Sequence, residues 1–191
     1  DRPNLSKDYL AGNAEEAWIP LRSDEFYAEN RIDLQLSTDV ERIDTDGRKV
    51  ITGDGRVFAY DRLLLATGAE PIRLKIAGVE RPHVFVLRSL ADSRAIIDNV
   101  QRAKSAVVLG AGFIGLEVAA ALRSRGLTVH VVTQDSRPFE HILGPDLGDF
   151  IRSVHEEHGV TFHLDTTIGA INDKSVILTN GRELAADMVI I

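Results

Sequence analysis

The stretch that decides the fold is Val107-Val108-Leu109-Gly110-Ala111-Gly112-Phe113-Ile114-Gly115. An apolar run leads into G-x-G-x-x-G, and helical periodicity follows up to Gly126, a residue type that commonly ends helices. In such a motif Gly110 permits the tight turn, Gly112 lets a pyrophosphate reach the backbone, and Gly115 allows the helix to pack closely on the sheet. The helix start, with Phe113 and Ile114, offers unpaired N–H groups to phosphates. A glycine turn without a ligand is the alternative, and the strand–turn–helix context favours a dinucleotide site over it.

The residues around this motif alternate between strand and helix. The expected order is strand, helix, strand, helix, strand over Ser105–Leu109, Phe113–Arg125, Leu127–Val132, Asp146–His158 and Val160–Leu164. Short apolar runs follow at Thr167–Ile171, Val176–Leu178 and Met188–Ile191, with a turn at Asn180-Gly181. We therefore expect an α/β fold: a Rossmann-type NAD(P)-binding domain, β-α-β-α-β with a small antiparallel meander, over residues 75–191.

The first part of the chain has a different pattern. Short helices are expected at Leu5–Leu10, with Ser6 as the N-cap, and at Ser23–Asn30. Strands are expected at Ile32–Leu36, Val40–Ile43, Lys49–Ile51, Val57–Tyr60 and Leu63–Ala66, with turns at Thr45-Asp46-Gly47 and Gly53-Asp54-Gly55. Gly68, Pro71, Gly78 and Pro82 indicate a crossover, and Ala91–Val100 should be helical.

Composition excludes several classes of protein. Hydrophobic residues make up 44% and charged residues 27%, a balance typical of globular proteins. There is no signal-peptide pattern and no apolar run of about 20 residues, so we expect no membrane span and a cytoplasmic location. The net charge of −7 argues against nucleic-acid binding. With no cysteine, these residues supply no disulfide, thiolate metal ligand or cysteine-pair relay.

The residues after the second strand bear on the choice between NADH and NADPH. An acidic residue at the end of the second strand would bind the ribose 2′-OH of NADH, and Thr133 stands where that acid is expected. Asp135 comes one or two positions late. Arg137 could instead meet the 2′-phosphate of NADPH, so the pattern favours NADH only slightly.

The motifs together resemble a known family. Arg2-Pro3-Asn4-Leu5-Ser6-Lys7-Asp8-Tyr9-Leu10, Leu65-Ala66-Thr67-Gly68-Ala69 and the stretch from Gly110 to Glu117 resemble the FAD-dependent pyridine nucleotide oxidoreductases, in the ferredoxin and rubredoxin reductase branch that includes apoptosis-inducing-factor-like proteins. Pro138-Phe139-Glu140 and Leu143-Gly144-Pro145 are similar to members that work with Rieske-type ferredoxins. Members are about twice this length. The chain therefore looks like a fragment with part of an FAD-binding domain at residues 1–74, expected to bind FAD weakly or not at all on its own.

The resemblance also implies roles for individual residues. Lys7 and Glu117 would form an ion pair near the flavin N5 that orients the nicotinamide, and Arg2 belongs to the same cofactor-binding stretch. Thr67 and Gly68 would lie near the FAD pyrophosphate or ribitol. On the residues alone, Lys7 reads as a surface lysine, Glu117 as a first-turn acid favoured by the helix dipole, and Gly68 as a strand-end glycine.

These roles imply a path for electrons. NADH or NADPH would reduce FAD, and electrons would leave singly to a ferredoxin, rubredoxin or Rieske-type carrier, because the chain has no thiol near the flavin. One rival is an NADH oxidase or quinone reductase; the other is a nucleotide-responsive binding protein of the apoptosis-inducing-factor type. The sequence leaves the oligomeric state open.

Three histidines raise the question of a metal. His155 and His158 lie three residues apart in an expected helix, with His163 nearby. This is not the H-E-x-x-H order, and a solvated helix end explains it better, so no metal site is expected.

Overall fold

The computed structural model describes residues 1–72 and 74–191, and they form two compact units. One unit contains Asp1–Ile19 together with Glu70–Ile191; the other contains Pro20–Ala69. This division differs from the expected boundary at residue 74, because the first nineteen residues pack with the C-terminal part of the chain. Within the described residues no helix is both long and apolar enough to cross a membrane.

A five-stranded parallel sheet forms the centre of the larger unit. Its order is β4–β11–β5–β6–β7, and every neighbouring pair is parallel. The strands are β4 (Val84–Phe85), β5 (Ser105–Leu109), β6 (Thr128–Val132), β7 (Val160–His163) and β11 (Met188–Ile190). The middle strands are apolar on both faces because both faces are covered. The expected β-α-β-α-β unit and its strand positions are confirmed.

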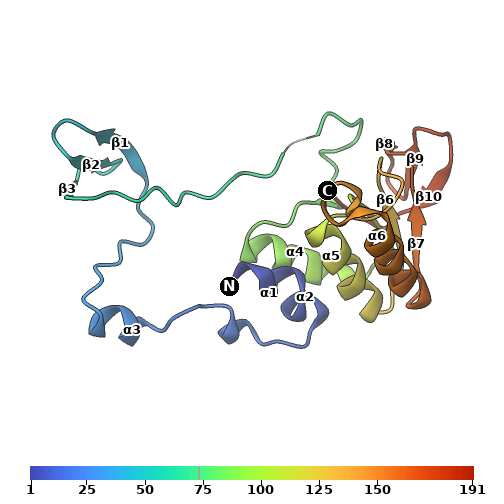
Figure 1. Ribbon diagram of the computed structural model, residues 1–191, viewed down its shortest axis with the longest axis horizontal. Helices are drawn as coiled ribbons and strands as arrows, with labels where there is room; N and C mark the ends of the chain where they lie inside the picture. The colour runs from blue at the N-terminus through green and yellow to red at the C-terminus, as the bar shows by residue number, and fades with distance from the viewer. Residues whose placement is uncertain (73) are drawn as a thin grey trace. The chain divides into compact units, whose positions relative to one another are not determined.

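Helices cover one face of this sheet, as Figure 1 shows. They are α4 (Leu90–Val100), α5 (Phe113–Ser124) and α6 (Glu140–Glu157). Ala106, Val108, Val129 and Val131 of the sheet share a core with Leu116 and Leu122 of α5 and Ile96 of α4. The opposite face, with Val107, Val132 and Val189, is covered by an antiparallel meander of β8 (Ile168–Ile171), β9 (Ser175–Leu178) and β10 (Glu183–Ala185). The sequence did not predict β10.

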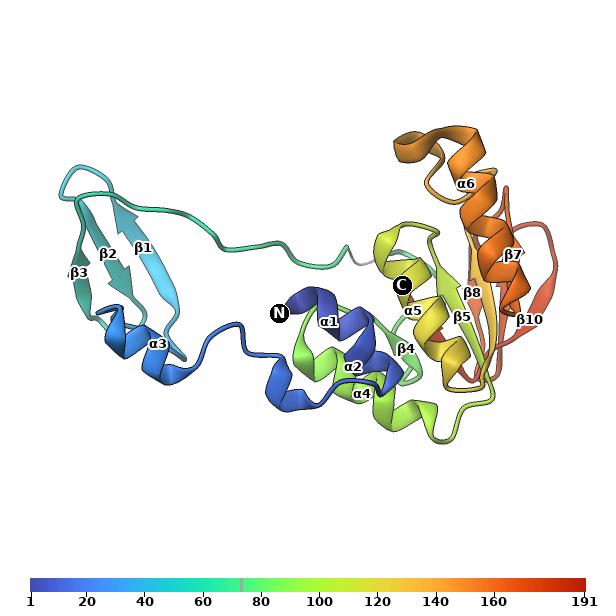
Figure 2. The ribbon, with the colours of Figure 1, turned by 60° about the horizontal axis from the view of Figure 1, so that its bottom comes forward.

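The N-terminal residues complete this core. They form α1 (Arg2–Ser6), α2 (Asp8–Ala11) and the 3-10 turn η1 (Glu16–Trp18), and Figure 2 shows α1 and α2 beside α4 and α5. Leu10 is fully buried in the same cluster. The single helix expected over Leu5–Leu10, capped by Ser6, is wrong. The backbone breaks at Lys7 (φ −110°, ψ −114°), and Ser6 ends α1 with its hydroxyl used elsewhere.

Helix α6 begins six residues before the expected Asp146. Gly144 interrupts it with a non-helical φ of 77°, immediately before Pro145. Proline disfavours the α conformation in the residue before it and has no N–H to donate, and glycine tolerates positive φ. The first turn is therefore a separate short segment, and the longer stretch after the kink matches the expected helix.

The smaller unit contains a helix and an antiparallel meander. Helix α3 covers Asp24–Glu29, and the sheet has the order β1 (Val40–Asp44), β2 (Lys49–Thr52) and β3 (Val57–Ala59). Gly55, with a φ of 83°, lies in the turn between β2 and β3. The expected hairpins are confirmed.

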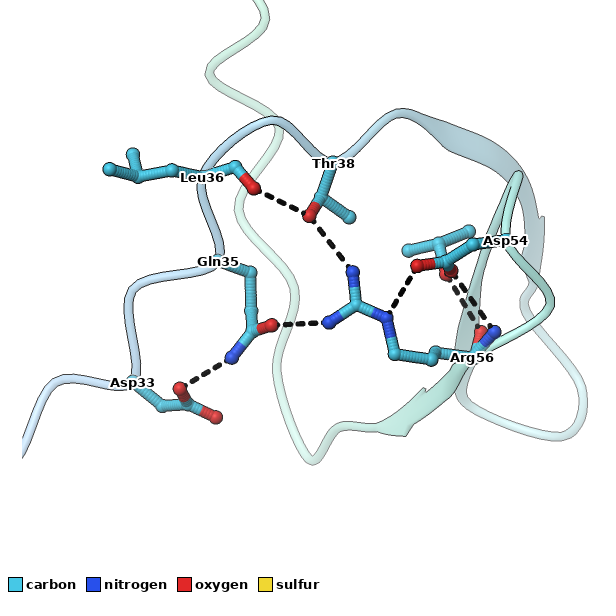
Figure 3. Close-up of polar contacts among 7 residues, drawn as sticks. Asp33, Gln35, Leu36, Thr38, Asp54 and Arg56 are labelled. Atoms are coloured by element: carbon cyan, nitrogen blue, oxygen red, sulfur yellow. Dashed lines mark hydrogen bonds and ion pairs between the residues drawn. The ribbon is translucent and has the colours of Figure 1, made fainter.

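Two expected strands of this unit are absent from the described residues. The chain at Ile32–Leu36 is coil, tied to the meander by Arg56: its guanidinium donates to Asp54 (2.7 Å), Gln35 (2.5 Å) and Thr38 (3.0 Å) (Figure 3). Leu63–Ala66 is also coil, and Leu64 is 85% exposed. A strand needs a neighbouring edge for its backbone hydrogen bonds, and neither segment has one among the described residues.

Candidate functional site

The glycine-rich turn has the geometry that the motif predicts. Gly110 follows β5 with a φ of 102°, a conformation that favours glycine, and its N–H donates to the Val132 carbonyl at 2.8 Å. At Gly115 an added Cβ would lie 2.2 Å from the Gly110 carbonyl oxygen. Only glycine therefore lets α5 approach the turn this closely.

Gly112 differs from the other two glycines, because the protein itself does not require glycine there. It precedes the first turn of α5 with ordinary backbone angles (φ −88°, ψ −171°). Among residues 1–72 and 74–191, nothing lies within 4 Å of an added Cβ and no side chain caps this helix start. Open space beside uncapped N–H groups fits an anionic group such as a pyrophosphate.

Phe113 and Ile114 form the first turn of α5 and are both more than half exposed. The Phe113 ring packs on Phe139 with the ring centroids 4.5 Å apart. Phe139 is in turn anchored by its N–H, which donates to the Ala111 carbonyl at 3.3 Å. The loop after β6 thus supports the glycine turn.

A pocket of about 380 Å³ lies between the first turn of α5 and helix α1. It is lined by polar and charged side chains beside apolar ones, namely Arg2, Pro3, Leu5, Ser6, Lys7, Leu87, Arg88, Phe113, Ile114 and Glu117. The structure therefore brings Arg2, Lys7, Glu117, Phe113 and Ile114, five predicted site residues, to one pocket. Its basic and acidic groups beside an exposed aromatic ring fit a polar, planar ring system.

Glu117 is the polar centre of this pocket. Its Oε1 lies 3.3 Å from the Lys7 Nζ, and its Oε2 accepts a 2.5 Å hydrogen bond from the Ser6 hydroxyl. The predicted ion pair is thus present, with Lys7 52% and Glu117 26% exposed. An ion pair this exposed contributes about 0–1 kcal/mol, whereas a hydrogen bond to a charged group contributes about 1.5–3 kcal/mol.

Ser6 is the residue of this pocket that the sequence interpretation misassigned. It is 5% exposed, and the bond to Glu117 crosses 111 positions of sequence. The sequence feature that could have identified Ser6 as a site residue is its position next to Lys7, in the stretch Arg2–Leu10 that resembles the family.

Thr133 and Arg137 lie in the loop between β6 and α6. Thr133 is buried, and its hydroxyl accepts from the Asp135 N–H at 3.3 Å. Arg137 is engaged by two carboxylates: its Nε donates to Asp149 at 3.0 Å, and its Nη1 lies 3.8 Å from Glu140. The Glu140 and Asp149 partners were not predicted.

Glu140 is itself held as an anion. The hydroxyl and N–H of Ser136 donate to it at 2.7 and 2.9 Å, and these bonds lower the pKa of Glu140. Arg137 thus lies between two carboxylates, and Asp135 of the same loop lies near Glu140 and His141, so carboxylates outnumber the one arginine in this region.

Thr67 and Gly68 lie at the end of the smaller unit, in exposed coil, where Gly68 has a φ of 77°. The strand expected to end there is not formed, as described above. Their assignment to FAD stays a prediction.

The three histidines do not gather into a ligand set. His155 lies 3.0 Å from the Ile151 carbonyl and His158 lies 2.7 Å from the Val154 carbonyl, while the His163 Nε2 lies 3.2 Å from the His130 Nδ1. Each imidazole therefore has a partner from the protein. Asp135, Glu140 and His141 approach within 4.8 Å of one another, and the Glu140 oxygens there already accept from Ser136.

Known proteins share both the sequence pattern and the fold. Residues 1–191 match the family described as pyridine nucleotide-disulphide oxidoreductase. Rhodocoxin reductase from Rhodococcus erythropolis is 36% identical over 195 residues, covering 100% of this chain and 46% of the relative. Rubredoxin-NAD(+) reductase from Pseudomonas putida is 36% identical over 196 residues, covering 100% of this chain and 51% of the relative.

The solved covalent complex of putidaredoxin reductase with putidaredoxin has a similar chain, with a TM-score of 0.91 and 34% identity over 99% of this chain and 48% of that one. The chain thus spans about half the length of the relatives it matches. Since the family match extends over every residue from 1 to 191, the chain belongs to the pyridine nucleotide-disulphide oxidoreductase family.

Proposed function

We propose that this chain belongs to an FAD-dependent oxidoreductase that passes electrons from NADH to a small iron–sulfur carrier. The observation that carries the proposal is the turn at Gly110–Gly115, with open space at Gly112 and an uncapped helix start beside the Glu117 pocket. We assign nicotinamide binding to residues 75–191 and part of the flavin site to residues 1–74.

In this proposal the chain supplies positioning and charge. The backbone at Gly112 and the first N–H groups of α5 bind the pyrophosphate, and Glu117 orients the nicotinamide end in the pocket. Lys7 and Arg2 offer positive charge on the flavin side, and Thr67 and Gly68 contribute to the FAD site. Bound FAD would supply the chemistry needed here, namely hydride acceptance and single-electron release.

The loop after β6 supports NADH rather than NADPH. Arg137 is the arginine placed to meet a 2′-phosphate, but Asp149 and Glu140 already engage it. A 2′-phosphate would also meet the excess of carboxylates there, whereas the neutral ribose hydroxyl of NADH would not. We assign the bond to that hydroxyl to Asp135, whose side chain is 38% exposed, and to the buried Thr133 the role of positioning it, since its hydroxyl accepts from the Asp135 N–H. The relatives' names support the same choice, since two of them are NAD(+) reductases.

An iron–sulfur carrier as acceptor is supported by the relatives and by the composition. The relatives include reductases of rubredoxin and putidaredoxin. The chain has no cysteine, so these residues cannot relay electrons through a thiol pair. We also propose a cytoplasmic location, because nicotinamide dinucleotides are kept inside cells.

The experiment uses the full-length, FAD-loaded protein that contains this chain: stopped-flow reduction by NADH, followed by mixing with an oxidised ferredoxin or rubredoxin, or with oxygenated buffer. The proposal expects flavin reduction by NADH and faster reoxidation by the carrier than by oxygen. Faster reoxidation by oxygen would favour the oxidase alternative, and no reduction by NADH would contradict the proposal.

A further inference from the structure

We propose that Ser6, more than Lys7, is the residue that holds the Glu117 carboxylate in position for the nicotinamide. This inference rests on the proposed function, since it concerns how the same pocket binds the nicotinamide end of NADH. Ser6 is a positioning residue, because it acts through Glu117.

The two oxygens of Glu117 are held by adjacent residues of one segment. Ser6 donates to Oε2 at 2.5 Å and Lys7 lies 3.3 Å from Oε1. The Ser6 Oγ also lies 3.2 Å from the Pro3 carbonyl. A hydroxyl has a single proton, and the much shorter distance to the carboxylate assigns that proton to Glu117.

Burial separates the two contacts in strength. Lys7 is half exposed, so water competes for its ammonium group and screens its charge. Ser6 is 5% exposed, so little water reaches its hydroxyl, and its bond goes to a charged acceptor. The Ser6 bond is therefore the stronger restraint on the carboxylate, although Lys7 carries the charge.

The backbone that carries Ser6 is also fixed. The buried hydroxyl of Ser93, on α4, donates to the Leu5 carbonyl at 3.0 Å. Leu5 and Leu10 on either side of Ser6 are buried, and Arg125 donates to the Leu10 carbonyl. The Ser6 hydroxyl is thus held in place before any ligand arrives, whereas the described part of the chain gives the Lys7 side chain no comparable anchor besides Glu117.

The test compares NADH with ADP-ribose, which keeps the pyrophosphate and adenosine but lacks the nicotinamide. Calorimetry gives the ratio of the two affinities for the native chain and for Ser6→Ala, Ser6→Thr, Lys7→Met and Ser105→Ala. Ser105→Ala is the matched control, since it removes a serine hydroxyl that bonds to Asp187 and does not line the Glu117 pocket.

The native chain should prefer NADH to ADP-ribose. Ser6→Ala should lower that ratio by about tenfold, with ADP-ribose affinity unchanged. Ser6→Thr keeps the hydroxyl and should keep the native ratio. Lys7→Met should lower the ratio by less than Ser6→Ala does. Ser105→Ala should lower the melting temperature without changing the ratio.

Three results would overturn the inference: an unchanged ratio in Ser6→Ala, equal native affinities for the two ligands, or a larger fall in Lys7→Met than in Ser6→Ala. If Ser6→Ala does not fold, Lys7→Met is compared with Ser6→Thr instead. A lower NADH to ADP-ribose affinity ratio in Ser6→Thr than in Lys7→Met would then contradict the inference. Failure of the proposed function looks different, since the native chain would then bind neither ligand.

Discussion

Replacing Gly115 with alanine should destabilise the protein through one specific contact. The new Cβ would lie 2.2 Å from the Gly110 carbonyl oxygen, about 1 Å closer than carbon and oxygen normally approach. Because that oxygen belongs to the backbone of a tight turn, the helix α5 must move to relieve the contact.

The magnitude follows from two opposing effects. Overpacking of a close contact costs about 3 kcal/mol at the upper end of its usual range, and alanine in a helix is favoured over glycine by about 1 kcal/mol. The net loss should be about 2 kcal/mol of unfolding free energy. In a chain of this size that lowers the melting temperature by about 4–8 °C.

The assay is urea and thermal denaturation followed by circular dichroism, with Gly112→Ala as the matched control. At Gly112 an added Cβ meets nothing within 4 Å, so this variant should keep nearly native stability. Under the proposed function it should nevertheless bind NADH about tenfold more weakly or worse, because its methyl group occupies the space for the pyrophosphate. Equal stability of the two variants would refute the reasoning about α5.

Three further predictions concern stability. Burial, with the neighbouring His130 imidazole and the Arg182 charge, lowers the pKa of His163 from 6.5 to about 4. The unfolded chain therefore binds the extra proton, and the free energy of unfolding should fall by about 2.5 kcal/mol between pH 6.5 and pH 4. Urea titrations at several pH values should show this fall in the free energy of unfolding, and His163→Leu should reduce its dependence on pH. An unchanged pH dependence in His163→Leu would contradict the assignment of the effect to His163. Asp187 accepts from the Lys104 N–H, the Lys174 ammonium group and the Ser105 N–H, and these bonds lower its pKa to about 2. Asp187→Ala should therefore cost about 2 kcal/mol at pH 7, and a cost below the error of the urea melt would count against these bonds. Ser89→Ala removes the capping box of α4 and should cost about 1 kcal/mol, with faster amide exchange in that helix; native exchange there would argue that the cap contributes nothing.

Local pattern was enough to predict the centre of the fold. The apolar run before Gly110, the glycine spacing and the helical periodicity up to Gly126 each depend on neighbouring residues, and the structure confirms all three. Lys7 and Glu117 were paired only through the family resemblance, because no local rule connects residues so far apart in sequence.

The incorrect predictions concern features that depend on contacts between residues distant in sequence, which a local pattern does not encode. Ile32–Leu36 and Leu63–Ala66 have the apolar character of strands, but a strand also needs a partner edge. Ser6 has the residue type of a helix cap, yet its hydroxyl serves a carboxylate 111 positions away. The ion pair between Arg137 and Asp149 likewise depends on how α6 packs against the loop that precedes it.

Calorimetric titration of the purified chain with NADH and then NADPH tests whether the turn at Gly110–Gly115 binds NADH. We expect saturable binding of one NADH per chain, and weaker binding of NADPH because Arg137 is already paired. Absence of binding by either nucleotide to a chain shown to be folded would contradict the claim. Tighter binding of NADPH than of NADH would still support a dinucleotide site at this turn, but it would contradict the interpretation that Arg137 is already paired.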